Sequence, residues 1–266
     1  MLNINFVKSQ QTIRKLIMKT YQLQLLTVLA MSTLINCTSA HTHHSGGIQS
    51  KIDKEVLAPF DVVHAKITSA GNIATFHMAV SGKAGKSKPA ATGKLSGSHV
   101  FSYVWPTSID SFEVGFEKQA GILALAVTAH PDFDDTPLYD ENADGDTSND
   151  GNVWHSHWVV LSPNEQCGEG ALGVVDIPEG TKPRLPKTWP GLPILLDSPG
   201  WDPVFDAQTI EVKVPFDHSD LVDHASFDGV TAGLRVNESV HAPLLCVVNV
   251  MDIASGDLSL PGKVNQ

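Results

Sequence analysis

The sequence predicts an all-β protein that folds as a single β-sandwich with long irregular loops. From residue 59 onward, short runs rich in Val, Ile, Phe and Thr alternate with clusters of Gly, Pro, Asn and Asp, the pattern of strands and turns. Almost nowhere does the chain hold an apolar face at the 3.6-residue spacing of a helix. No linker-like change of composition interrupts the runs, so we expect one domain over residues 59–266.

The first predicted element is a β-hairpin within residues 61–82. A two-residue turn at Ala70-Gly71 would set His64 directly opposite His77. Directly opposed residues have Cβ atoms ~4.5–5.5 Å apart, so one metal ion could take both imidazoles. A slip of one residue would instead send the two rings to opposite faces of the sheet.

The remaining strands follow at intervals to the C-terminus. Residues 153–161 should lie centrally, because they carry large apolar side chains on both faces. Residues 178–203 hold seven of the 16 prolines and should form an irregular surface crossover. The other predicted strands are 99–105, 111–117, 122–129, 173–177, 209–214, 230–236 and 244–252.

The N-terminal segment, residues 1–40, reads as a signal peptide. Met18-Lys19 precedes an apolar run over residues 23–30, and Thr38-Ser39-Ala40 supplies small residues for cleavage. The run is shorter than the ~20 residues that span a bilayer, so we predict no transmembrane segment. A secreted, periplasmic or outer cell-surface location follows, with a lipid anchor at Cys37 as the alternative. Residues 41–58 should be a flexible, His-containing arm.

Charge and cysteine content agree with export. Four of the 18 basic residues and none of the 29 acidic ones lie in residues 1–40, so the remaining chain carries 14 basic residues and a net charge of −15. Such an acidic balance excludes nucleic acid and anionic membranes as partners and favours metal ions. In an oxidising compartment, Cys167 and Cys246 should form a disulfide.

An aspartate-rich loop predicts a calcium site. Oxygen-bearing side chains alternate before a glycine at the sixth position, as in the first half of an EF-hand loop, but Gly151 replaces the glutamate expected at the twelfth. Asp132, Asp134 or Asp135 could complete the site. The alternative is a solvated acidic turn. The predicted calcium ligands are Asp140, Asn142, Asp144, Asp146 and Asp150.

Five histidines on or beside predicted strands form the candidate copper site. His155 and His157 share one face of their strand, because side chains alternate along it. Imidazoles suit copper, zinc, iron and nickel, and a soft site favours copper. A single strand histidine is usually structural, but five together indicate that at least two bind one metal. The candidates are His64, His77, His130, His155 and His157.

Two alternatives use other ligands. Cleavage before His41 would create an N-terminal histidine able to join a copper brace, as in oxidative polysaccharide-cleaving enzymes. A haem-binding, DOMON-like electron-transfer module could instead use His77 and Met78. The sequence contains no nucleophile elbow, phosphate-binding glycine loop or His-Glu-x-x-His motif, so we expect binding and no catalysis.

The pattern over residues 59–253 resembles a small group of secreted or surface-associated copper-binding proteins of methanotrophs, the copper-repressible CorA proteins and the C-terminal part of MopE. The shared features are an exported acidic β-rich chain, strand histidines, a Trp-rich strand and an aspartate-rich loop. The resemblance implies a Cu(I) site of two histidines with a weaker third ligand. It also implies a role in copper acquisition or storage at the cell surface. We expect metal ions as partners, and another exported copper or redox protein as a further one.

Overall fold

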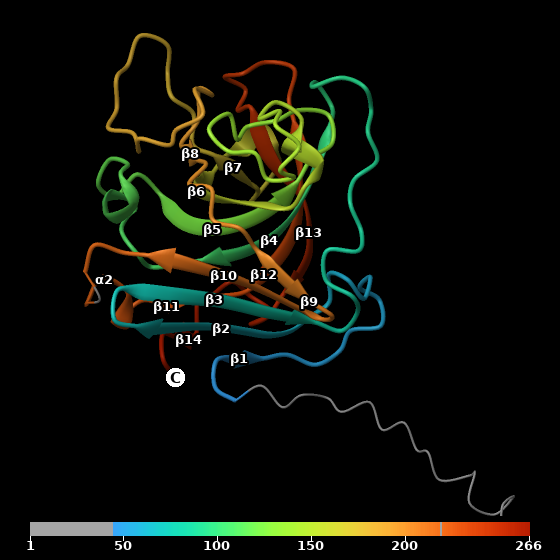
Figure 1. Ribbon diagram of the computed structural model, residues 1–266, viewed down its shortest axis with the longest axis vertical. Coiled ribbons are helices and arrows are strands. Elements are labelled where there is room, and N and C mark those ends of the chain that lie inside the picture. Colours follow the sequence, from blue (N-terminus) through green and yellow to red (C-terminus); the bar gives the residue numbers. More distant parts are fainter. Residues whose placement is uncertain (1–44, 219) are drawn as a thin grey trace, which may run out of the picture. The chain divides into compact units, whose positions relative to one another are not determined.

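The computed structural model describes residues 45–218 and 220–266, and strands dominate this part of the chain (Figure 1). The predicted all-β class with long loops is confirmed. Ser45–Gln266 forms one compact unit. The predicted signal peptide over 1–40, the lipid anchor at Cys37 and the brace at His41 lie outside the described residues.

A five-stranded antiparallel sheet forms one layer. Its order is β1 (Ile48–Gln49), β2 (Val62–Ala70), β3 (Ile73–Val80), β10 (Thr209–Pro215) and β9 (Val204–Asp206). Part of the predicted N-terminal arm therefore belongs to the sheet, because β1 pairs with β2.

The second layer is a sheet that closes on itself. Its order is β5 (Ile122–Ala129), β4 (His99–Pro106), β12 (Val230–Val236), β13 (Leu245–Ile253), β7 (Leu172–Val174), β6 (His155–Pro163) and β8 (Leu196–Asp197). Since β6 also pairs with β5, six strands form a closed barrel, with β8 attached outside the ring. The sandwich that the sequence predicts is thus a sheet packed against a barrel.

Small elements complete the described chain. The strands β11 (Ser226–Phe227) and β14 (Gly262–Lys263) pair with each other. The short helices are η1 (Ser111–Val114), η2 (Asp150–Asn152), η3 (Glu165–Cys167) and α2 (Asp220–Asp223). No helix among the described residues is long and apolar enough to cross a membrane.

Two hydrophobic cores follow from this arrangement. The first lies between the layers, where Phe76 of β3 meets Trp105 of β4 and Trp158 of β6 edge to face. The second lies inside the barrel and consists of the inward-facing residues of its strands, among them Val104 and Leu161. Strands with apolar residues on both faces, such as β6, serve both cores, which explains their continuous hydrophobic character.

Two predictions of secondary structure need correction. Residues 111–117 do not form a strand: the carboxylate of Asp110 accepts the Phe112 N–H and caps a 3₁₀ turn that ends at Gly115. The proline-rich segment 178–203 is largely irregular as predicted, yet Leu196 and Asp197 pair with β6 and are buried. An apolar run, Ile194 to Leu196, directs this part of the crossover inward.

Candidate metal centre

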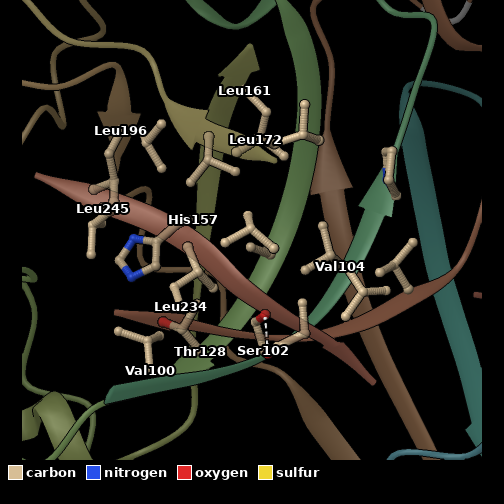
Figure 2. Close-up of a pocket in the computed structure, with 18 of the residues that line it drawn as sticks. Val100, Ser102, Val104, Thr128, His157, Leu161, Leu172, Leu196, Leu234 and Leu245 are labelled. Atoms are coloured by element: carbon tan, nitrogen blue, oxygen red, sulfur yellow. Dashed lines mark hydrogen bonds between the residues drawn. The ribbon is translucent and has the colours of Figure 1, made fainter. Parts of the chain in front are cut away.

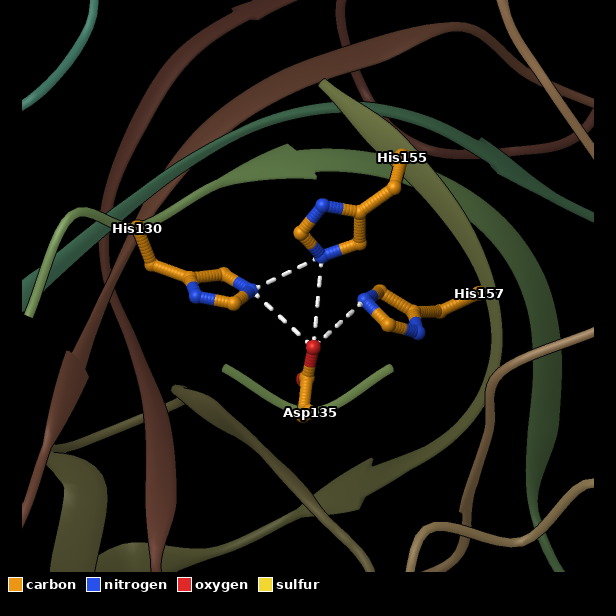
Figure 3. Close-up of side chains that lie close together, drawn as sticks. All are labelled: His130, Asp135, His155 and His157. Carbon is orange, nitrogen blue, oxygen red and sulfur yellow. Dashed lines mark hydrogen bonds and ion pairs between the residues drawn. The ribbon is translucent and has the colours of Figure 1, made fainter. Parts of the chain in front are cut away.

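Four buried side chains converge at one end of the barrel (Figure 3). His130 follows directly after β5, and His155 and His157 are the first and third residues of β6. Asp135 comes from the loop that joins these neighbouring strands. Among the described residues, this is the only group of three or more His, Cys, Asp or Glu side chains whose ligand atoms all lie within 4.8 Å of one another.

The carboxylate oxygen Oδ1 of Asp135 lies at the centre of the histidines. It is 3.2 Å from Nε2 of His130, 3.2 Å from Nε2 of His155 and 3.3 Å from Nε2 of His157. The Nε2 atoms of His130 and His155 are 3.0 Å apart. Each residue therefore presents one potential ligand atom to a common point.

Backbone carbonyls orient the three rings. Nδ1 of His130 is 2.9 Å from the Phe133 carbonyl oxygen, and Nδ1 of His155 is 2.7 Å from that of Val153. Nδ1 of His157 is 3.2 Å from the Asp197 carbonyl oxygen. Because a carbonyl only accepts hydrogen bonds, each Nδ1 must carry the proton, which leaves the Nε2 lone pair of a neutral ring available for a metal.

The rings also rest on apolar neighbours. Phe133 stacks on His130 with ring centroids 4.1 Å apart and planes inclined by 7°. The exposed fractions of His130, Asp135, His155 and His157 are only 1–3%. Such burial excludes water from the cluster, so its electrostatic interactions are stronger than at the surface.

Protonation of this cluster is strongly perturbed. Burial lowers the pKa of His155 to about 4. Burial also opposes protonation of His130, but the adjacent Asp135 outweighs it and raises the pKa of His130. Burial acts to raise the pKa of Asp135, yet His157 and His130 hold that pKa well below its usual range. The cluster thus favours an ionised carboxylate accompanied by a positive charge.

That positive charge can be a proton or a metal ion. With every Nε2 unprotonated, the lone pairs of His130 and His155 would face each other at 3.0 Å and repel. Nε2 of His157 and Oδ1 of Asp135 are buried without a hydrogen-bond partner. A cation at the common point would satisfy all four atoms at once, which is the usual solution for a buried anion and convergent imidazoles.

Four of the six donor–donor separations, at 3.0–3.3 Å, fit the edges of a tetrahedral donor set. Metal–ligand bonds of ~2.0–2.1 Å give ligand–ligand separations of about 3.3 Å at every edge of a tetrahedron. A square-planar site would instead place one of the three nitrogens about 4 Å from the oxygen, across the metal. Asp135 Oδ1 is nearly equidistant from the three Nε2 atoms. Three nitrogens and one oxygen in this arrangement suit Zn²⁺.

Close backbone packing shapes the loop that carries Asp135. The Gly151 carbonyl accepts the His130 N–H at 2.6 Å. A Cβ at position 151 would overlap the carbonyl oxygens of Phe133 and His130, so only glycine fits there. Asp134 accepts hydrogen bonds from the Asp150 and Thr136 amides. These contacts tie both ends of the loop together beside the histidines.

His64 and His77 lie together on the five-stranded sheet, away from this centre. The predicted register is wrong: the turn is at Gly71-Asn72, with Gly71 at φ +60°, and a β-bulge lies between Val62 and His64. His64 therefore pairs with Ala79, two residues from His77. Residues two apart on a strand point to the same face of the sheet, so the rings of His64 and His77 remain neighbours, with centroids 5.3 Å apart.

The predicted calcium ligands occupy a largely exposed loop, apart from the buried Asp150. Their side-chain oxygens accept hydrogen bonds from loop amides: Asp140 accepts the Asp144 and Gly145 N–H groups, and Asp150 those of Glu141 and Asn142. Asn142, Asp144 and Asp146 accept amides two residues further on. The calcium site stays a prediction.

The sequence predicts the three histidines as metal ligands, but it offers Asp135 only as a possible ligand of the calcium loop. The sequence feature that could have identified Asp135 is its position: it lies in the loop between two strands that pair with each other and that carry histidines at the ends facing this loop.

The geometry does not favour the haem alternative. Met78 is buried in the core between the layers, while the adjacent His77 points to the opposite face of β3.

The predicted Cys167–Cys246 disulfide is present, with Cα atoms 5.3 Å apart.

Comparisons with protein families, curated proteins and solved structures yield no match for this chain. The chemistry of the centre is therefore inferred from its own residues.

Proposed function

We propose that this protein is an exported metal-binding protein that holds one divalent transition-metal ion through His130, Asp135, His155 and His157. The observation that supports this most strongly is the convergence of three Nε2 atoms on Asp135 Oδ1 at 3.2–3.3 Å. The anionic oxygen donor disfavours Cu⁺, and the nearly equal distances from Asp135 Oδ1 to the three Nε2 atoms disfavour square-planar Cu²⁺, so Zn²⁺ is the preferred ion.

Four protein donors leave no obvious position for a substrate on a tetrahedral ion. Closed sites of this kind are typical of structural or storage roles, whereas catalytic zinc keeps one position for water. Binding, and not catalysis, is therefore the proposed activity. The acidic balance and the disulfide support export, where the protein would meet metal ions outside the cytoplasm.

Elemental analysis with matched variants tests the proposal. We expect about one zinc per chain after dialysis against Zn²⁺, and loss of that zinc in His155→Ala and His157→Ala. His99→Ala is the control, since His99 lies at the exposed start of β4. Full zinc retention by both ligand variants would contradict the assignment.

Copper binding by His64 and His77 is a second candidate function. It is favoured by their ring separation of 5.3 Å and by the resemblance to copper-binding surface proteins. Glu211 lies 3.1 Å from Nδ1 of His77 and orients that ring. We expect Cu⁺ to bind the native protein and to bind at least tenfold more weakly to the His64→Ala, His77→Ala double variant. Unchanged copper affinity in that variant would remove the candidate.

A calcium ion in the loop over Asp140–Asp150 is proposed as a brace for the metal centre. Calcium takes carboxylate and carbonyl oxygens, which this loop supplies in number. Isothermal titration with Ca²⁺ tests it, with Asp144→Asn and Asp146→Asn expected to abolish the binding heat. The absence of any calcium heat in the native protein would show that the loop is a solvated acidic turn.

A further inference from the structure

The barrel interior contains a cavity of about 90 Å³ that is partly open to its surroundings, and Figure 2 shows part of its lining. Alternate residues of its strands point into this space, so the cavity follows from the period-two pattern of the closed barrel. Its lining includes Val104 of β4, Ala126 of β5, Val159 of β6 and Ala232 of β12. Side chains just fill the interior of an eight-stranded barrel, so space inside this six-stranded one requires small side chains. Ala126 and Ala232 are the smallest residues of the lining.

The metal centre forms one end of this cavity. His130, Asp135 and His157 are part of the lining, and Figure 2 shows His157 among the apolar side chains. The strand register places Val100 beside His130 at this end and Val230 and Ile253 towards the other. Val250 also lines the cavity and is 49% exposed, so the cavity approaches the solvent on the β13 side.

The wall of the cavity is apolar. The Ser102 hydroxyl donates to the Ala232 carbonyl, and the ligand nitrogens face the metal position, so these polar groups are turned away from the space. A buried water needs two to four polar partners, and apolar cavities without them stay dry. The cavity therefore suits an apolar occupant and not water.

Volume limits that occupant. An engineered apolar cavity of about 150 Å³ in another protein accepts benzene or xenon, whereas drug-sized ligands need about 300 Å³ or more. A space of about 90 Å³ is too small for a long acyl chain or an aromatic ring of benzene's size. It accommodates a gas or a short hydrocarbon of roughly four heavy atoms or fewer, judged against that benzene-sized reference.

We propose that the barrel cavity is a binding site for a small apolar molecule, held directly against the histidine and aspartate side chains of the metal centre. The site is distinct in chemistry from the metal position, because its ligand is held by apolar contacts. The part of this proposal that places the ligand against a bound metal rests on the proposed function. The binding of an apolar molecule in the cavity does not depend on it.

Xenon is the probe of choice, since it is spherical, apolar and detectable by anomalous scattering. Crystals of the zinc-loaded protein under xenon pressure should show one xenon atom inside the barrel, beside Ala126 and Ala232. Ala232→Leu fills the space and should lower xenon occupancy at least tenfold. Ala91→Leu adds the same side chain at an exposed position and should leave occupancy unchanged. Ordered water in the cavity, or no xenon there in the native protein, would overturn the proposal without any need for the variant to fold.

A second readout separates this proposal from the proposed function. Metal content is measured before gas is added, so loss of the metal function is seen independently of xenon uptake. In the Co²⁺-substituted protein, cyclopropane should shift the visible absorption bands of the metal, and Ala232→Leu should abolish the shift. Xenon uptake without any such shift would contradict contact between the ligand and the metal centre.

Discussion

At the scale of single residues, Asp135 determines what the cluster can bind. Without its carboxylate the site would be three neutral imidazoles, which also suit Cu⁺; with it, the site is anionic and favours a divalent ion. The sequence showed the three histidines because they flank the loop at strand ends. It could not single out Asp135 from its neighbours Asp132 and Asp134, since only the folded loop turns one of these carboxylates inward.

Asp135→Asn keeps the size of the side chain and removes its charge. We expect zinc affinity to fall by more than about 100-fold, because even partners outside the ligand shell typically contribute 10–100-fold to metal affinity. Competition with a chromophoric chelator measures this. Asp202→Asn, at an exposed position, is the control and should bind zinc as the native protein does. Equal affinity in the two variants would show that Asp135 is not a ligand.

Glu141 predicts a pH dependence of stability that is separate from the histidines. Burial, reinforced by the nearby Asp150, raises the pKa of Glu141 to about 7. The folded state therefore binds this proton more tightly than the unfolded state, in which the pKa of the glutamate is about 4.5. The contribution of Glu141 to stability is fully present below pH 4.5 and is lost as pH rises through about 7.

Glu141→Gln should remove that dependence. We expect the variant to match the native protein near pH 4.5 and to be more stable than it at pH 8, as measured by urea denaturation in the presence of a chelator. Saturating Ca²⁺ should narrow the difference at pH 8 if the loop binds calcium. Parallel stability profiles of the two proteins between pH 4.5 and 8 would contradict the assigned pKa.

At the scale of elements, local rules predicted the hairpin and most strands, and failed where a turn or a backbone contact decided the outcome. The register was misassigned because Gly71, and not Ala70, begins the two-residue turn and adopts positive φ. Gly151 seemed only to break an EF-hand pattern, yet close packing against the carbonyls of Phe133 and His130 requires glycine there.

Gly151→Ala should therefore damage the metal centre without touching a ligand. The added Cβ must displace the backbone of His130 and Phe133, which misaligns donors that need to converge within a few tenths of an ångström. We expect weaker zinc binding and a lower melting temperature. Gly191→Ala is the control for metal geometry, because its Cβ meets open space although its φ of +90° is strained. Zinc affinity that falls equally in both variants would argue against the packing role.

The disulfide strengthens the weakest strand pairing of the barrel, between β7 and β13. Strands β7 and β13 share a single residue pair, Cys246 with Gly173, and the bond from Cys246 to Cys167 holds the same two segments together. For a sequence separation of 79 residues, the chain-entropy model gives about 4.5 kcal/mol of stabilisation. The Cys167→Ser, Cys246→Ser double variant should lose roughly 2–4 kcal/mol of unfolding free energy. Unchanged stability would show that the pairing of β7 with β13 holds the barrel closed without the disulfide.

At the scale of the whole molecule, barrel closure is what brings the site together. Pairing of β5 with β6 sets Thr128 opposite His155 and so places His130 beside them. The order of strands in a sheet depends on contacts far apart in sequence, which is why composition and periodicity indicated two layers but not that one of them closes. The same closure creates the apolar cavity behind the metal ligands.

X-ray absorption spectroscopy of the zinc-loaded protein tests the central claim most directly. A tetrahedral site made by His130, Asp135, His155 and His157 predicts four nitrogen or oxygen neighbours at ~2.0 Å, with the outer-shell scattering of three imidazoles. A six-coordinate shell of oxygen neighbours without imidazole scattering would place the zinc elsewhere and contradict the account.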